Sequence, residues 1–190
     1  NELFLSVWKQ GIFGVDFFQI IIGLGIFVLF LIFRGLISKL VIKKLELISK
    51  RTTNKLDDTF VKSMEGPARF LPIVLGVFFA SYYMSFDNET RSFIDNINRT
   101  LITILIFWII HQLIEPISYV LSGLDNVLTK ELIGWIIKSL KILIFILGAA
   151  AVLELWGIKI GPIIAGLGLF GVAVALGAQD LFKNLISGIL

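Results

Sequence analysis

The sequence lacks cysteine, has a single histidine, and is poor in charge, since only 16% of its 190 residues are Asp, Glu, Lys or Arg. Without cysteine, disulfide bridges and thiolate metal sites are excluded, and one histidine argues against a conventional zinc site. No catalytic triad, phosphate-binding glycine loop or catalytic carboxylate pair is visible. We therefore expect no metal, no cofactor and no enzymatic activity.

Hydrophobic residues, in contrast, are in excess. They make up 57% of the chain, against about 45–50% in soluble domains, and the mean hydropathy is +0.93. They gather in runs of about 20 residues, the length that crosses a bilayer core. Because lipid leaves only helices or closed barrels as spanning structures, we predict an all-α integral membrane protein. Its five transmembrane helices are expected at residues 15–37, 67–86, 100–121, 132–155 and from 161 to the end.

Basic residues indicate the orientation of these spans. If the spans alternate, thirteen of the 17 Lys and Arg residues fall on one side, which the positive-inside rule assigns to the cytoplasm. The N-terminus is then outside and Leu190 is inside. We read the net charge of +3 as orientation and not as nucleic-acid binding. Four basic residues after the first span are expected to contact lipid headgroups: Arg34, Lys39, Lys43 and Lys44.

The chain divides into three expected parts. Residues 1–65 hold an outer segment, the first span and a basic cytoplasmic connection, whose residues 46–65 are expected to continue as a helix with a turn near 56–59. Residues 66–156 hold helices two to four, and residues 157–190 hold the last helix and its continuation. The chain starts at Asn1 without a signal peptide and stops at Leu190 without a helix cap. We therefore expect it to be part of a longer protein.

The last span is crowded with glycine and alanine. Glycine inside a helix costs about 1 kcal/mol relative to alanine in water, and the reason for so many in a membrane helix is close helix packing. At about 100° per residue, Leu169, Val172 and Leu176 form an aliphatic stripe that continues to Gln179. Small residues lie on both flanks of this stripe, with Gly168, Gly171 and Ala175 on one and Gly166, Ala173 and Gly177 on the other.

Two small-residue flanks suit a homo-oligomeric ring in which each helix packs against two neighbours. The stripe would then face the axis and form an apolar constriction that excludes water. The alternative is a Gly/Ala-rich helix buried in a monomeric bundle, as in many transporters.

After Gln179 the polar residues move to one face, and an amphipathic half-helix at the inner membrane surface is expected. That face holds Asp180, Lys183, Asn184 and Ser187. A bend is expected between the two halves, and the hinge candidates are Gly177, Asp180 and Gly188.

Residues 161–190 resemble the small-conductance mechanosensitive channel (MscS) family. The resemblance rests on the Gly/Ala-rich helix followed, at the family's spacing, by Gln179, Asn184, Leu185 and Gly188. The preceding helix, with Gly134, Trp135 and Lys138, is also similar to members with five transmembrane helices. Two positions depart from the family pattern: Asp180 replaces the usual glycine at the bend, and Val172 replaces the usual leucine.

The resemblance implies a homoheptameric channel of the bacterial inner (plasma) membrane. Membrane tension would open it on hypo-osmotic shock, and it would release ions and small solutes. Its partners would be membrane lipids and further copies of itself, not nucleic acid. The family's pair of pore-closing residues falls on Val172 and Leu176, with Leu169 and Gln179 lining the pore. The competing hypothesis is a monomeric or dimeric secondary transporter with a Gly-rich core helix.

Two ionisable residues within the third span stand apart from this pattern. His111 and Glu115 are four residues apart and can pair along one helix face. Ionisable groups within membrane helices often mark proton pathways. We favour a structural pair over a proton relay, because Glu115 precedes Pro116 near the inner end of the helix.

Overall fold

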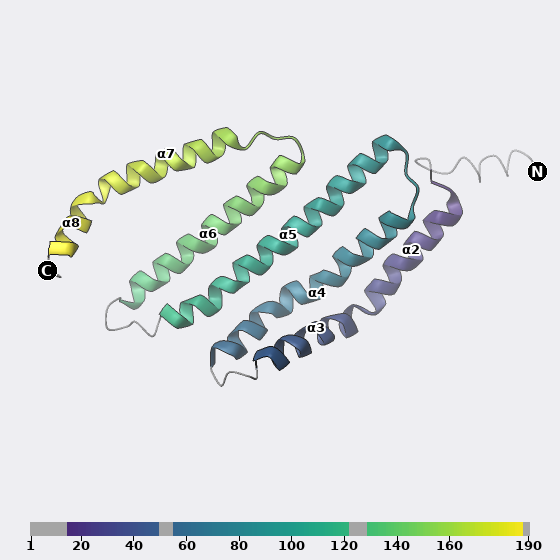
Figure 1. The fold of residues 1–190 in the computed structure, drawn as a ribbon, viewed down its shortest axis with the longest axis horizontal. Coiled ribbons are helices and arrows are strands. Elements are labelled where there is room, and N and C mark those ends of the chain that lie inside the picture. Colours follow the sequence, from purple (N-terminus) through teal and green to yellow (C-terminus); the bar gives the residue numbers. More distant parts are fainter. Residues whose placement is uncertain (1–14, 50–54, 122–128, 188–190) are drawn as a thin grey trace, which may run out of the picture. The chain divides into compact units, whose positions relative to one another are not determined.

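The computed structural model describes residues 15–49, 55–121 and 129–187, and its regular elements are helices. The chain forms two compact units, Asn1–Val152 and Leu153–Leu190. The first unit contains α2 (Phe17–Ile32), α3 (Arg34–Ser49), α4 (Lys55–Tyr83), α5 (Asn88–Leu121) and most of α6 (Lys130–Leu155) (Figure 1). The second contains the end of α6 with α7 (Gly161–Gly177) and α8 (Gln179–Ser187).

Among the residues that the structure describes, three helices are long and apolar enough to cross a membrane, within residues 59–83, 88–117 and 130–155. The pair α2 and α3 counts as a fourth only if it is taken as one broken span, and α7 is a shorter apolar helix. The part of the chain that the structure describes therefore fits a multi-pass helical membrane protein.

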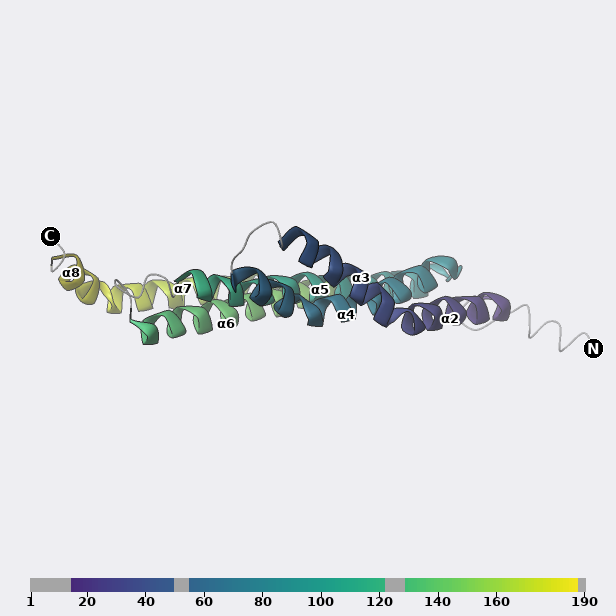
Figure 2. The same cartoon turned by 90° about the horizontal axis from the view of Figure 1, so that it is seen from below.

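The first predicted span, residues 15–37, is not one continuous helix. It breaks at Phe33, and α2 and α3 meet at an angle of 51°. The break separates an apolar helix from one that carries four basic residues, whose charges are costly in hydrocarbon. Figure 2 shows the C-terminal end of α3 rising away from α4 and α5.

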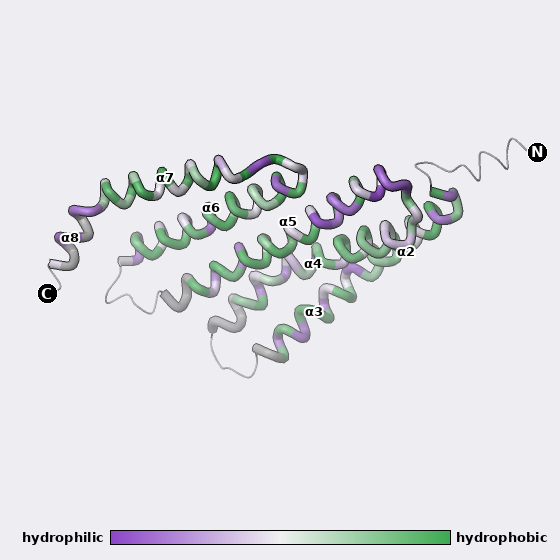
Figure 3. Tube along the Cα trace, turned by 45° about the horizontal axis from the view of Figure 1, so that its top comes forward, coloured by the Kyte–Doolittle hydropathy of each residue, from purple (hydrophilic) through white to green (hydrophobic). Residues whose placement is uncertain are grey.

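The predicted starts of the second and third spans were also wrong. Helix α4 begins at Lys55, so Pro67 and Pro72 lie inside it and the turn expected at 56–59 is helical. Membrane helices tolerate an internal proline when neighbouring groups satisfy the freed carbonyl. Helix α5 begins at Asn88, twelve residues before its predicted start, and Figure 3 shows this first part as mainly hydrophilic.

Helix α4 is the centre of the first unit, because it packs against α2, α3 and α5. It approaches α2 closely at Gly76, where an added Cβ would lie 2.9 Å from the Cβ of Phe30. The rings of Phe30 and Phe79 stack beside it with centroids 5.6 Å apart. Glycine at this position therefore allows two backbones to approach, as small residues do in membrane helix pairs.

Polar side chains join α2, α4 and α5 around the connection at residues 84–87. Asn98 of α5 donates from Nδ2 to Ser81 Oγ of α4 at 2.7 Å, and both residues are buried. The Ser81 hydroxyl in turn donates to the Phe78 carbonyl at 2.9 Å. Gln19, in the first turn of α2, accepts from the Ser85 backbone N–H at 3.1 Å. One hydrogen bond thus joins α4 to α5, and another joins α2 to the segment between them.

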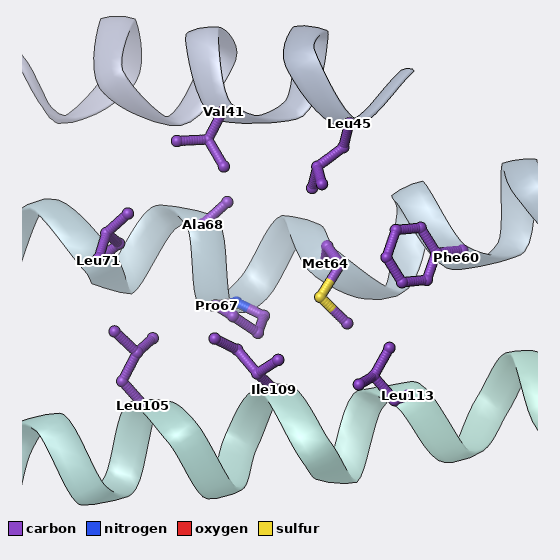
Figure 4. A pocket seen from close by; sticks show the side chains of 10 residues that line it. All are labelled: Val41, Leu45, Phe60, Met64, Pro67, Ala68, Leu71, Leu105, Ile109 and Leu113. Carbon is purple, nitrogen blue, oxygen red and sulfur yellow. The ribbon is translucent and has the colours of Figure 1, made fainter. Parts of the chain in front are cut away.

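An apolar cavity of about 300 Å³ lies between α3, α4 and α5 (Figure 4). The side chains that line it are all apolar, so they offer none of the hydrogen-bond partners that a water molecule would need. The lining consists of Val41, Leu45, Phe60, Met64, Pro67, Ala68, Leu71, Leu105, Ile109 and Leu113.

Asp87 caps the N-terminus of α5 with its side-chain carboxylate. Its Oδ1 accepts from the Thr90 backbone N–H at 2.9 Å, and hydrogen bonds from the Thr90 side chain and backbone lower the pKa of Asp87 below 3.8. A lowered carboxyl pKa stabilises the fold at neutral pH, and this contribution disappears as pH falls through the lowered value. Thermal unfolding in detergent should show Asp87→Ala less stable than the parent at pH 7, with the difference closing below pH 3.8.

Asp87→Asn is the matched control, because asparagine caps equally well but does not titrate. It should keep the stability of the parent at pH 7. An Asp87→Ala difference that persists unchanged at the lowest pH would contradict the role of the carboxylate.

Candidate pore-lining site

The candidate site begins where α6 ends, in a turn built on Gly157. Gly157 has φ +80°, the left-handed region that other residues rarely adopt. Its N–H donates to the Glu154 carbonyl at 3.0 Å, and the Ile158 N–H donates to the Leu153 carbonyl at 3.1 Å. These are the two hydrogen bonds of a Schellman motif, which ends a helix by satisfying its last carbonyls.

Helix α7 starts at Gly161, as predicted, with Pro162 in its first turn. Proline suits this position because its missing N–H would have no partner there. The helix then runs for 17 residues without a break, through the whole Gly/Ala-rich segment.

The aliphatic stripe of α7 is open. Leu169 is 76% exposed, Val172 58% and Leu176 66%, and no residue of α7 is buried. Phe170 and Val174, on the side away from the stripe, are exposed as well. So large an apolar surface on one helix indicates a surface that another helix or lipid covers.

The glycines on the two flanks are open in the same way. A Cβ added at any of them would meet no atom within 4 Å, unlike one added at Gly76. The flank glycines with this property are Gly166, Gly168, Gly171 and Gly177. The predicted packing residues Ala173 and Ala175 are exposed too. Within the described residues of its own unit, these small residues therefore have no packing partner.

A break separates α7 from α8. Gly177 is the last residue of α7, and the break falls on Ala178, with φ −90° and ψ −3°. Its N–H still donates to the Val174 carbonyl at 2.9 Å. Because φ stays negative at the break, no glycine is needed there. Gly188, the third hinge candidate, lies outside the described residues.

Asp180 lies in the first turn of α8, directly after Gln179. A carboxylate in this position interacts favourably with the partial positive charge of a helix N-terminus. The four polar residues expected on one face of α8 are exposed: Asp180, Lys183, Asn184 and Ser187. Replacement of the family's glycine by aspartate is therefore compatible with a bend at this place.

The predicted lipid-contacting residues Arg34, Lys39, Lys43 and Lys44 are on α3 and all are exposed. Residues Val41 and Leu45 of the same helix face the apolar cavity instead. Helix α3 thus exposes its basic residues together with Leu36, Leu40 and Leu47, and packs Val41 and Leu45 against the cavity. Acidic and histidine side chains within 15–49, 55–121 and 129–187 form no group of three that could hold a metal ion.

One ion pair was missed by the sequence interpretation. The Lys141 ammonium of α6 donates to the Glu115 carboxylate of α5. Opposite charges on two consecutive predicted spans were a signal that such a pair could form, although they do not specify the register that brings the two residues together. The pairing of Glu115 with His111 stays a prediction.

Comparisons with known proteins agree with the expected family. Residues 138–179, which cover most of α6 and all of α7, match the family model described as "Mechanosensitive ion channel, transmembrane helices 2/3". No solved structure matches the chain significantly.

Three relatives are similar over nearly the whole chain. An uncharacterized MscS family protein of Aquifex aeolicus is 29% identical over 100% of this chain and 52% of its own length. The MscS family protein YhdY of Bacillus subtilis is 29% identical over 96% and 51%. The small-conductance mechanosensitive channel MscMJ of Methanocaldococcus jannaschii is 30% identical over 98% and 53%. The chain thus spans about half the length of these relatives.

Proposed function

Because this chain belongs to the MscS family of mechanosensitive channels, we propose that it is the membrane part of an ion channel that opens under membrane tension. The observation that carries the proposal is α7, whose apolar stripe is flanked on both sides by small, open residues. The family model reaches through this helix to Gln179. Ions and small solutes would pass through the channel on hypo-osmotic shock.

The pore would be a homo-oligomeric ring, and by resemblance a heptamer. In a ring, each α7 presents one flank to each neighbour, and Gly168 and Gly171 meet small residues such as Ala173 and Gly177. The stripe then points to the axis. This arrangement gives both flanks and the stripe a role, whereas a helix dimer would use only one small-residue face.

The gate would be two stacked apolar collars, at Val172 and Leu176. A narrow apolar pore expels water because it offers no hydrogen bonds to replace hydration. Leu169 would line the pore on the outer side and Gln179 on the inner side. The closed pore would be slightly wider at Val172 than it would be with leucine.

Tension would act through the helices that precede α7. It favours whichever state has the larger area in the membrane plane, by that difference alone. The basic residues of α3 would hold this helix at the anionic inner surface through lipid headgroups, each contributing about 1 kcal/mol. The protein would lie in the bacterial inner membrane, with its N-terminus outside and Leu190 in the cytoplasm.

The gate is tested by placing a polar residue in the collar. Leu176→Ser should lower the tension needed for opening, or let the channel leak at rest, because the hydroxyl removes part of the dewetting barrier. Val174→Ser is the matched control on the other side of α7 and should leave the gate apolar. Patch-clamp recording with calibrated suction decides between them. Equal thresholds for Leu176→Ser and the parent, at equal abundance, would remove Leu176 from the gate.

The ring is tested at a flank. A Cβ at Gly171 meets no atom within 4 Å in the single chain, so Gly171→Leu should fold as a subunit but fail to assemble. Native mass spectrometry should show a ring for the parent and mainly subunits for the variant. A monomer or dimer of the parent would favour the transporter hypothesis instead. An unchanged ring in the variant would contradict the flank assignment.

The orientation is tested with cysteines, which the sequence lacks. A cysteine at Asn88 should react with an impermeant thiol reagent added to intact cells, and a cysteine at Asn54 should not. The reverse labelling pattern would overturn the orientation derived from the basic residues.

A further inference from the structure

Helices α5 and α6 touch at two points whose spacing matches. At the first, a Cβ on Gly148 of α6 would lie 2.9 Å from Phe107 Cγ and 3.0 Å from Phe107 Cβ. At the second, Lys141 of α6 pairs with Glu115 of α5. The ion pair is eight residues further along α5 and seven residues back along α6. Both contacts therefore belong to one antiparallel register, about two helical turns apart.

The rest of α6 is mostly uncovered within the single chain. Its buried residues are Ile133 and Ala150, whereas α4 packs closely against α2, α3 and α5. Lipid tails are as apolar as the surface of α6, so hydrophobicity gives α6 no preference for α5 over lipid. A specific polar contact and a close backbone approach are what can fix the register.

The ion pair is suited to this task because of its depth and geometry. Lys141 is eleven residues into α6, about 16 Å from its first residue, and both residues lie within segments long enough to span a membrane. A charge as far inside a span as that of Lys141 is costly unless it is paired, whereas Glu115 lies two residues before the end of its span. A slide of α6 by one turn would separate the two charges. By contrast, the pairs Arg69–Glu65 and Arg91–Asp95 each lie within one helix and do not restrain a neighbour.

We propose that Glu115 and Lys141 are a positioning pair that clamps α5 to α6 in the register set by Phe107 and Gly148. Force on the peripheral helices α2 to α5 then passes through this clamp into α6, whose chain continues through Gly157 into α7. The transmission step rests on the proposed channel function. The clamp itself does not.

Cysteine cross-linking tests the clamp without reference to conduction. In the full-length protein, free of other cysteines and in its native membrane, Phe107→Cys with Gly148→Cys should form a disulfide rapidly once copper phenanthroline is added as the oxidant. The 3.0 Å between the two Cβ positions is about half an ångström below the usual disulfide range, a gap that a small shift closes. Protection of both thiols from a maleimide mass tag measures the yield. Phe107→Cys with Ala149→Cys, about 100° further round α6, should cross-link poorly.

Adding Glu115→Gln to the cross-linking pair should slow disulfide formation about threefold, the effect expected for one interhelical polar contact in a membrane. The charge-swapped combination Glu115→Lys with Lys141→Glu should restore the rate, which mere loss of packing would not. Glu65→Gln breaks a pair within α4 and should leave the rate unchanged. An unchanged rate in Glu115→Gln, or no rescue by the swap, would overturn the clamp.

Patch-clamp recording tests the transmission. Glu115→Gln and Lys141→Gln should each raise the tension threshold, the double Gln variant should match the single ones, and the charge swap should restore the parent threshold. Equal thresholds in all variants, with the cross-linking results as expected, would overturn the transmission step. A parent protein without tension-gated current would instead count against the proposed function, while the cross-linking result still decides the clamp.

Discussion

Helices in a bilayer gain nothing by hiding apolar surface from one another, because the lipid around them is equally apolar. What holds this chain together is therefore close backbone approach and a few polar contacts. Gly76 lets α4 approach Phe30 of α2, and Gly148 lets α6 approach Phe107 of α5. The hydrogen bond from Asn98 to Ser81 joins α4 and α5. Helix α7 differs from these helices, because a Cβ added at any of its glycines would meet no atom within 4 Å.

Hydropathy predicted the apolar segments of the helices more reliably than the residues at which the helices begin. Helix α6 was expected at 132–155 and runs from Lys130 to Leu155, because its apolar run starts almost at its first residue and the turn at Gly157 ends it. Helices α4 and α5 both begin about twelve residues before their predicted starts. Their first turns are polar, and a helix that starts in water gives no hydropathy signal at its first residue.

Residue preferences also failed to predict where helices continue and where they bend. Pro67 looked like the first turn of a helix because an internal proline costs a hydrogen bond, yet α4 continues through it. No proline lies at the 51° bend at Phe33, so the sequence did not predict it. At the candidate site, the stripe at Leu169, Val172 and Leu176 followed from the helical period alone. What covers that stripe depends on other chains, which one sequence does not contain, and the Glu115–Lys141 pair depended on a register that no local pattern encodes.

The length of α7 has a consequence for the lipid itself. Seventeen residues rise about 26 Å, less than the ~30 Å of a typical hydrocarbon core. The helix begins at Gly161, with Pro162 in its first turn, and ends at the break on Ala178. A helix that is too short is accommodated by local bilayer thinning or by oligomerisation. In a ring of such helices, the cost of matching the pore to the bilayer would depend on the length of the lipid acyl chains. Thinner membranes would fit the ring with less distortion than thicker ones.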